Sequence, residues 1–190
     1  MPRRILSLVL VALVAAGAAG CADQVSPAIR VGDASVSNDE LLDEIDQWIN
    51  NPVAVDPAQV SGLTPGGYPG ELVRQLILQR IDFMLHEQEF DRLGLEVTDE
   101  RRNEGLVRLF GDPAAAGDAF SAFSEEFASS FTDDVARQVA VEAELGEDYA
   151  AWYAEAYGST DIEVNPRYGT WDPATRSVTA PAAATPTAAG

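Results

Sequence analysis

The segment from Leu72 to Leu85 is the feature that most limits what this chain can fold into. Its apolar residues recur at spacings of three and four and would surround most of the circumference of a helix: Leu72, Val73, Leu76, Ile77, Leu78, Ile81, Phe83, Met84 and Leu85. Such a helix needs other elements on more than one side. We therefore expect a central helix that begins after Pro69 and ends at Leu93-Gly94.

Capping residues mark two further helices. Ser37 is followed three residues later by Glu40, which is the spacing of a capping box, and the helix that it opens should end at Asn50. Thr98 has the same role at the start of a helix that should reach about Phe110. The early part of the chain is therefore predicted to be helical.

Two more helices are expected in the second half. A shorter one is predicted over 118–129, with Phe120, Phe123 and Phe127 on one side, and a long one from about Thr132 to Tyr157. Together these segments predict a mainly α fold, a helical bundle.

Short extended segments precede and follow the helices. Residues 28–31 read as a strand before a Gly-Asp turn, and residues 162–164 read as another, while residues 168–171 predict a turn or a second extended piece. Because helices separate them, we expect the terminal strands to pair and to close one domain over residues 28–175.

The first twenty residues have the layout of a secretory signal. Arg3 and Arg4 precede an apolar run from Ile5 to Val14, and small residues follow up to Gly20. The run is too short for a permanent membrane-spanning helix. Residues 1–20 are therefore expected to be a signal peptide, outside the fold.

Cys21 is the only cysteine, and Ala18-Ala19-Gly20-Cys21 resembles the lipobox of bacterial lipoproteins. This resemblance implies a palmitate-type lipid on Cys21, a linker over 21–27 and an exported protein held at the extracytoplasmic face of the cell membrane. The alternative is an ordinary secretory signal before an early cysteine. Two acyl chains on Cys21 would anchor the protein firmly to the membrane.

Charge excludes one class of partner. The chain has a net charge of −19 and contains no lysine, and loss of the two signal arginines would leave about −21. Phosphate backbones repel such a chain, so nucleic acid is not an expected partner. Residues 176–190, rich in Ala, Thr and Pro, are expected to form a disordered tail.

The usual catalytic and metal-binding motifs are missing. His86 is the only histidine and has Phe90 four residues later, so a zinc-protease helix is incomplete, and no metal or other cofactor is expected. We expect His86 on a helix surface. No Gly-x-Ser-x-Gly elbow occurs. Catalysis by a pair of carboxylates stays an alternative, although the preferred interpretation is that the acidic residues form solvated helix faces.

Three stretches carry a resemblance to a known family. Residues 29–37, residues 76–100 and residues 164–173 resemble, in this order, segments of SurA-like and PrsA-like bacterial chaperones, and the likeness covers residues 27–175. It implies a SurA N-terminal-domain-like bundle whose helices hold unfolded polypeptides. Only a few residues separate the last helix from Ile162, so the parvulin isomerase domain of that family is lacking, and its activity is not implied.

Three functions are therefore considered. The first is a holdase-like chaperone for unfolded or newly exported polypeptides, without catalysis, with an exposed apolar cradle. The second is a single-partner adaptor or assembly factor of the cell envelope. The third is an enzyme, which would need a pocket where carboxylates converge and have perturbed pKa values. The candidate client-binding residues, those that would contact the held polypeptide, are Phe83, Met84, Phe120, Phe123, Phe127 and Phe131. For each of them, an ordinary position in the core is the preferred interpretation.

Overall fold

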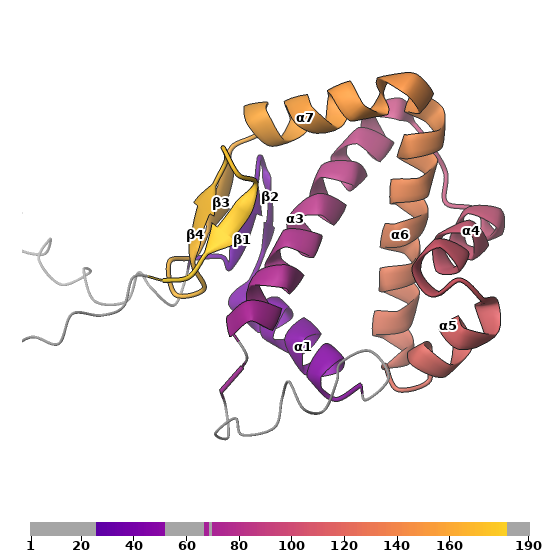
Figure 1. Cartoon of the computed structure of the whole chain (residues 1–190), viewed down its shortest axis with the longest axis horizontal. Helices are drawn as coiled ribbons and strands as arrows, with labels where there is room; N and C mark the ends of the chain where they lie inside the picture. The colour runs from indigo at the N-terminus through magenta and orange to yellow at the C-terminus, as the bar shows by residue number, and fades with distance from the viewer. Residues whose placement is uncertain (1–25, 52–66, 69, 182–190) are drawn as a thin grey trace, which may run out of the picture.

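The computed structural model describes residues 26–51, 67–68 and 70–181, and its long helices surround a central one (Figure 1). The elements are β1 Ile29–Val31, β2 Ala34–Val36, α1 Asn38–Ile49, α3 Gly70–Leu93, α4 Asp99–Phe110, α5 Pro113–Phe120, α6 Glu125–Leu145, the 3-10 turn η2 Gly146–Asp148, α7 Tyr149–Ser159, β3 Ile162–Val164, β4 Thr170–Asp172 and β5 Ser177–Thr179. α6 packs between α3 and α4, and α7 crosses the end of α3 to return to the strands.

The terminal strands pair, as predicted. β1 lies in the middle of a three-stranded antiparallel sheet, between β2 and β3, with Ile29 opposite Val164 and Val31 opposite Ile162. A second sheet consists of the antiparallel pair β4 and β5. The predominantly helical fold class is thus confirmed, with the short strands joining the beginning and the end of the described chain.

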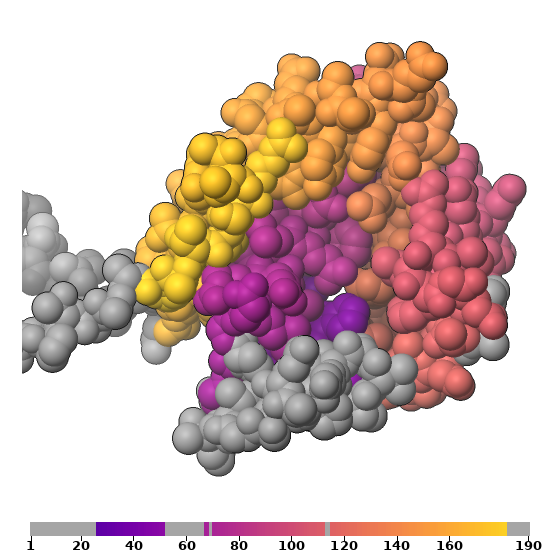
Figure 2. All heavy atoms as spheres, viewed as in Figure 1, coloured from indigo at the N-terminus to yellow at the C-terminus, as the bar shows by residue number. Residues whose placement is uncertain are grey.

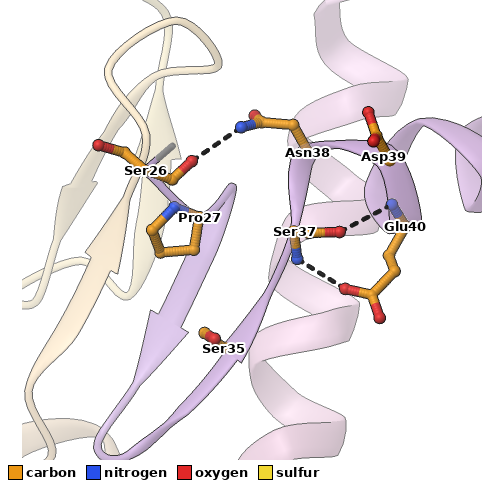
Figure 3. Close-up of a pocket in the computed structure, with 7 residues that line it drawn as sticks. All are labelled: Ser26, Pro27, Ser35, Ser37, Asn38, Asp39 and Glu40. Atoms are coloured by element: carbon orange, nitrogen blue, oxygen red, sulfur yellow. Dashed lines mark hydrogen bonds between the residues drawn. The ribbon is translucent and has the colours of Figure 1, made fainter. Parts of the chain in front are cut away.

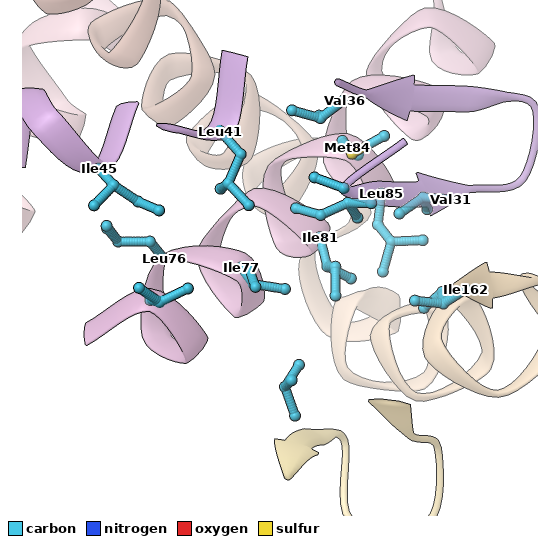
Figure 4. Packing of buried hydrophobic residues seen from close by; sticks show 14 of the residues in the cluster. Val31, Val36, Leu41, Ile45, Leu76, Ile77, Ile81, Met84, Leu85 and Ile162 are labelled. Atoms are coloured by element: carbon cyan, nitrogen blue, oxygen red, sulfur yellow. The ribbon is translucent and has the colours of Figure 1, made fainter. Parts of the chain in front are cut away.

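The expectation of a central helix is confirmed by α3. Ile77 and Ile81 have no exposed surface, and both belong to a core that α3 builds with α1 and the strands (Figure 4). Strand residues Val31 and Ile162 contribute to the same core. The wide apolar surface of α3 is therefore explained by partners on several sides.

The predicted caps are present. The Ser37 hydroxyl accepts from the Glu40 amide at 3.1 Å, and the Ser37 amide donates to Glu40 Oε2 at 2.8 Å, which completes the capping box. Thr98 accepts from the Arg101 amide at 3.2 Å and opens α4. Gly111, with φ of 72°, ends that helix.

The predicted helix over 118–129 is wrong. α5 ends at Phe120, and α6 begins only at Glu125. The side chain of Ser124, just before α6, accepts a hydrogen bond from the Phe127 amide at 3.2 Å. Ser124 is a helix cap, and its extended backbone separates the two helices.

The single long helix from Thr132 to Tyr157 is also wrong. Gly146 has a positive φ of 51°, which glycine adopts readily and which interrupts the helix between α6 and α7. The helix axis changes direction there, and this is what brings α7 across α3 (Figure 1).

The expected start of the tail at residue 176 needs correction. Ser177–Thr179 form strand β5, in which buried Val178 pairs with Trp171 of β4. The second extended piece expected near Trp171 is confirmed as β4. Residues 182–190 of the expected tail, and the signal and Cys21, lie outside the described residues.

A close contact between α4 and α6 gives a stability prediction. A Cβ at Gly105 would lie 2.5 Å from Cγ1 of Val135, a buried β-branched side chain with little freedom to move. We expect Gly105→Ala to lower the free energy of unfolding by about 1–2 kcal/mol. Gly117→Ala on α5, which meets nothing within 4 Å, is the matched control and should stabilise or be neutral. Urea denaturation of both variants checks this, and equal effects would contradict it.

Candidate functional site

A pocket of about 500 Å³ lies between α1, α3 and α6. Figure 2 shows the surface hollowed between α3 and the α5–α6 side, with atoms of α1 visible in the depth. Its lining residues come from all three helices and from the cap of α6: Glu40, Asp43, Glu44, Asp46, Gln47, Arg80, Phe83, Ser124, Glu126, Phe127, Ser130, Phe131 and Asp134. The pocket thus combines acidic groups with aromatic rings.

Packed rings form one wall of this pocket. The rings of Phe83 and Phe131 meet at right angles with centroids 5.6 Å apart, and those of Phe127 and Phe131 stack at 6.1 Å. The rings of Trp48 of α1 and Phe131 pack edge to face, with their centroids 5.4 Å apart. Such edge and stacked contacts hold the rings in fixed positions.

A charged group lies beside the rings. Arg80 of α3 donates to Asp134 of α6 at 2.9 Å, and its Nε lies 3.4 Å from Oε2 of Glu44 of α1. Arg137 binds the other carboxylate oxygen of Asp134 at 2.7 Å. Glu44 and Asp134 are only 6 % and 8 % exposed, so one arginine joins two buried carboxylates from different helices.

Burial determines the protonation of these carboxyl groups. Desolvation raises the pKa of Glu44, and the positive charge of Arg80 only partly opposes it. Desolvation likewise raises the pKa of Asp134, against the opposing charges of Arg80 and Arg137. The two groups therefore hold protons at a higher pH than ordinary carboxyl groups do.

The hydrogen bonding of this group is incomplete. Within the described residues, Glu44 Oε2 and Arg80 Nε are buried and make no hydrogen bond, although they face each other as an ion pair. Buried polar atoms without a hydrogen bond are rare in folded proteins. Attraction between opposite charges, and not a well-formed hydrogen bond, therefore joins Arg80 to Glu44.

Exposed carboxylates surround the opening. Asp46 accepts a hydrogen bond from the Tyr68 hydroxyl at 3.0 Å. Asp43 and Glu126 have neither hydrogen bonds nor ion pairs with other described residues. The opening of the pocket is therefore strongly negative.

The structure places most of the candidate client-binding residues in the interior. An exposed cradle was expected, but Phe83, Met84, Phe123 and Phe131 are buried, and Phe120 and Phe127 are half-buried. Packing of the five phenylalanines against Trp48 and one another accounts for their burial. Three of the six, Phe83, Phe127 and Phe131, still line the pocket, while Met84 lies in the other core around α3.

Sequence reasoning missed the charged group. Glu44 lies between Leu41 and Ile45 on the apolar face of α1, and Arg80 precedes fully buried Ile81 in the central helix α3. A charged residue inside an apolar face is a usable signal for a buried ion pair. Its partner Asp134 could not be chosen from the sequence, because α6 had to be placed first.

His86 was expected on a helix surface, and this is wrong because its side chain is 0 % exposed. Its Nδ1 donates to the Asp82 carbonyl at 2.7 Å, and its Nε2 accepts from the Tyr149 hydroxyl at 3.0 Å. Tyr157 and Gln138 donate to the Asp82 carboxylate at 3.2 and 2.9 Å. These groups connect α3, α6 and α7 and leave His86 no free nitrogen for a ligand.

A smaller pocket of about 290 Å³ lies at the start of α1 (Figure 3). Its polar groups already bind one another: Asn38 donates to the Ser26 carbonyl at 2.8 Å, and Ser37 and Glu40 form the capping box. It is therefore explained by helix capping.

Comparison with known proteins gives no relative. No family model, no curated protein and no solved structure matches the chain. No described group of three or more His, Cys, Asp or Glu side chains is placed to hold a metal ion. None of the described helices is both long and apolar enough to span a membrane.

The carboxylates of the pocket also bear on an enzymatic role. Glu44 and Asp134 converge in one pocket, and the pKa values of both are raised, as an active site built on two carboxylates would require. However, both oxygens of Asp134 are bound by guanidinium groups, one from Arg80 and one from Arg137. An Asp134 carboxylate held in this way is poorly placed to exchange protons with a substrate.

Proposed function

We propose that this chain is a holdase-like binding protein without catalytic activity, which holds unfolded or newly exported polypeptides. Lipid on Cys21 would anchor it to the extracytoplasmic face of the cell membrane. The observation that carries the proposal is the pocket between α1, α3 and α6, where fixed aromatic rings lie beside unpartnered carboxylates. Segments of an unfolded chain carry both apolar and polar groups, and such a pocket offers contacts to both.

The architecture supports this proposal. The hairpin, the capped helix and the closing strand follow one another in the order expected from the resemblance to SurA-like chaperones. The strong negative charge would keep a complex with an aggregation-prone client in solution.

Aggregation suppression tests the proposal. The full chain is added to insulin while the disulfides of insulin are reduced, and light scattering is followed. We expect near-complete suppression at near-stoichiometric ratios. Ser130→Tyr should reduce it several-fold, because exposed Ser130 lines the pocket and a large ring there would fill the opening.

Ser129→Tyr is the matched control, since Ser129 is also exposed on α6 but does not line the pocket. It should suppress scattering like the unmodified chain. If the unmodified chain leaves scattering unchanged, general holding of polypeptides is rejected, and a single-partner adaptor becomes the better hypothesis. Crosslinking from the membrane would then identify the partner.

A further inference from the structure

We propose that the pocket between α1, α3 and α6 selects polypeptide segments in which a cationic side chain, Lys or Arg, lies next to an apolar residue. This inference rests on the proposed function, because it names the class of polypeptide that the site takes. Three independent features of the pocket carry it: its charge, an unsatisfied buried oxygen and its aromatic wall.

The charge of the lining is strongly unbalanced. Arg80 is the only cationic residue among the lining residues, against six carboxylates: Glu40, Asp43, Glu44, Asp46, Glu126 and Asp134. Glu40 is used in the capping box and Asp46 binds Tyr68, but the Asp43 and Glu126 side chains form neither hydrogen bonds nor ion pairs with described residues. An incoming cation would therefore gain favourable interactions that the folded chain itself does not supply.

The second feature is the Glu44 side chain. It is more than nine-tenths buried and lines the pocket, and its Oε2 accepts no hydrogen bond from any described residue. Arg80 lies 3.4 Å away and compensates charge without satisfying this oxygen. A cation bound in the pocket would add a second favourable charge beside Glu44, whereas an aliphatic or acidic group would not.

The third feature is the wall of rings. Phe127 and Phe131 are stacked with an interplanar angle of 27°, and Phe83 meets Phe131 edge to face. Aromatic faces attract ammonium and guanidinium groups, and they also contact the methylene stem of Lys or Arg and a neighbouring apolar side chain. The cation is thus specified by the carboxylates, and the adjacent apolar residue by the rings.

Peptide binding measures this selectivity. The full chain is titrated into three fluorescein-labelled nonapeptides with the repeats Ala-Lys-Phe, Ala-Gln-Phe and Ala-Glu-Phe, and anisotropy is recorded at low salt. We expect the Lys peptide to bind at least about tenfold more tightly than the Gln peptide, and the Glu peptide to bind weakest. Raising the salt concentration should weaken binding of the Lys peptide more than binding of the other two peptides.

Two double variants separate the pocket from the overall negative charge. Asp43→Asn with Glu126→Gln removes the unpartnered carboxylates and should abolish most of the preference for Lys. Glu147→Gln with Asp148→Asn changes the net charge equally at exposed positions of η2, outside the pocket lining, and should change affinity less than twofold.

The outcomes distinguish this inference from the function on which it rests. Equal affinity for the Lys and Gln peptides overturns the selectivity, and so does equal weakening by the two double variants. If the peptides bind equally and insulin scattering is still suppressed, polypeptide holding stands without cation selection. If no peptide binds and scattering is unchanged, both the selectivity and the proposed function are rejected.

Discussion

Replacing Arg80 by methionine is expected to lower the free energy of unfolding by about 3 kcal/mol at pH 7. Arg80 is the guanidinium that joins Glu44 and Asp134, and its side chain is only 27 % exposed. Methionine fills a similar volume, so the loss comes from two buried carboxylates that are left without this compensating charge. Arg74→Met on the same helix is the matched control. Among the described residues, Arg74 forms an ion pair only with exposed Glu71, so its replacement should cost less than about 1 kcal/mol.

The pH dependence of this variant is the sharper test. Burial raises the pKa of Glu44 and Asp134 in the folded protein, and loss of Arg80 removes a charge that opposes this rise. The folded state then binds protons more readily than the unfolded chain, so the contribution of these groups to stability is fully present below pH about 4 and is lost as the pH rises through their folded pKa values.

The stability difference between Arg80→Met and the unmodified chain should therefore be largest near pH 7 and shrink as the pH is lowered toward about 4. Urea denaturation at several pH values measures it. Adding Glu44→Gln and Asp134→Asn to the Arg80→Met variant should restore most of the loss at pH 7. A difference that does not change with pH would show that packing, and not charge, accounts for the effect.

A second large loss of stability is expected from His86→Ala, which should lower the free energy of unfolding by about 3 kcal/mol. The ring of His86 packs against Trp152 with centroids 5.0 Å apart, and its Nε2 accepts from Tyr149. Burial and the nearby Asp82 carboxylate raise the pKa of Tyr149, so its hydroxyl stays protonated and needs an acceptor. Alanine leaves both a cavity and an unpaired hydroxyl.

Three further variants, His86→Phe, Tyr149→Phe and the combination of both, separate these contributions. His86→Phe keeps the ring but removes the acceptor, and it should cost about 1–2 kcal/mol. Adding Tyr149→Phe removes the hydroxyl that was left unpaired, so part of the loss should return. Thermal unfolding of the two single variants and the double variant gives the coupling between the two positions. Strict additivity would refute a direct interaction between His86 and Tyr149.

Local signals explain which parts of the fold were predictable. The helices opened by Ser37 and Thr98 and the central helix after Pro69 were predicted because caps and apolar periodicity lie within the segments themselves. The break at Ser124 was missed although a serine before two glutamates is a cap signal, and Gly146 was missed because one glycine inside an apolar stripe does not usually end a helix.

The site depended on contacts between distant segments. The aromatic residues were recognised as a group, but whether they would be exposed or buried depended on how α5 and α6 pack against Trp48. The Arg80 group joins residues from α1, α3 and α6, and no local pattern specifies which carboxylates will meet. His86 was misplaced for the same reason, since α7 covers it only after the turn at Gly146.

The pairing of β1 with β3 also has a consequence for how the chain reaches its native state. Ile29 and Val164 are neighbours in the sheet, but all of the described helices lie between them in sequence. During synthesis, β1 can pair with β2 at once, but its other edge stays open until residue 164 has emerged. Closing so long a loop is slow relative to forming local helices. The helices can therefore form early, while the joining of the terminal strands is expected to be the late step that completes the domain.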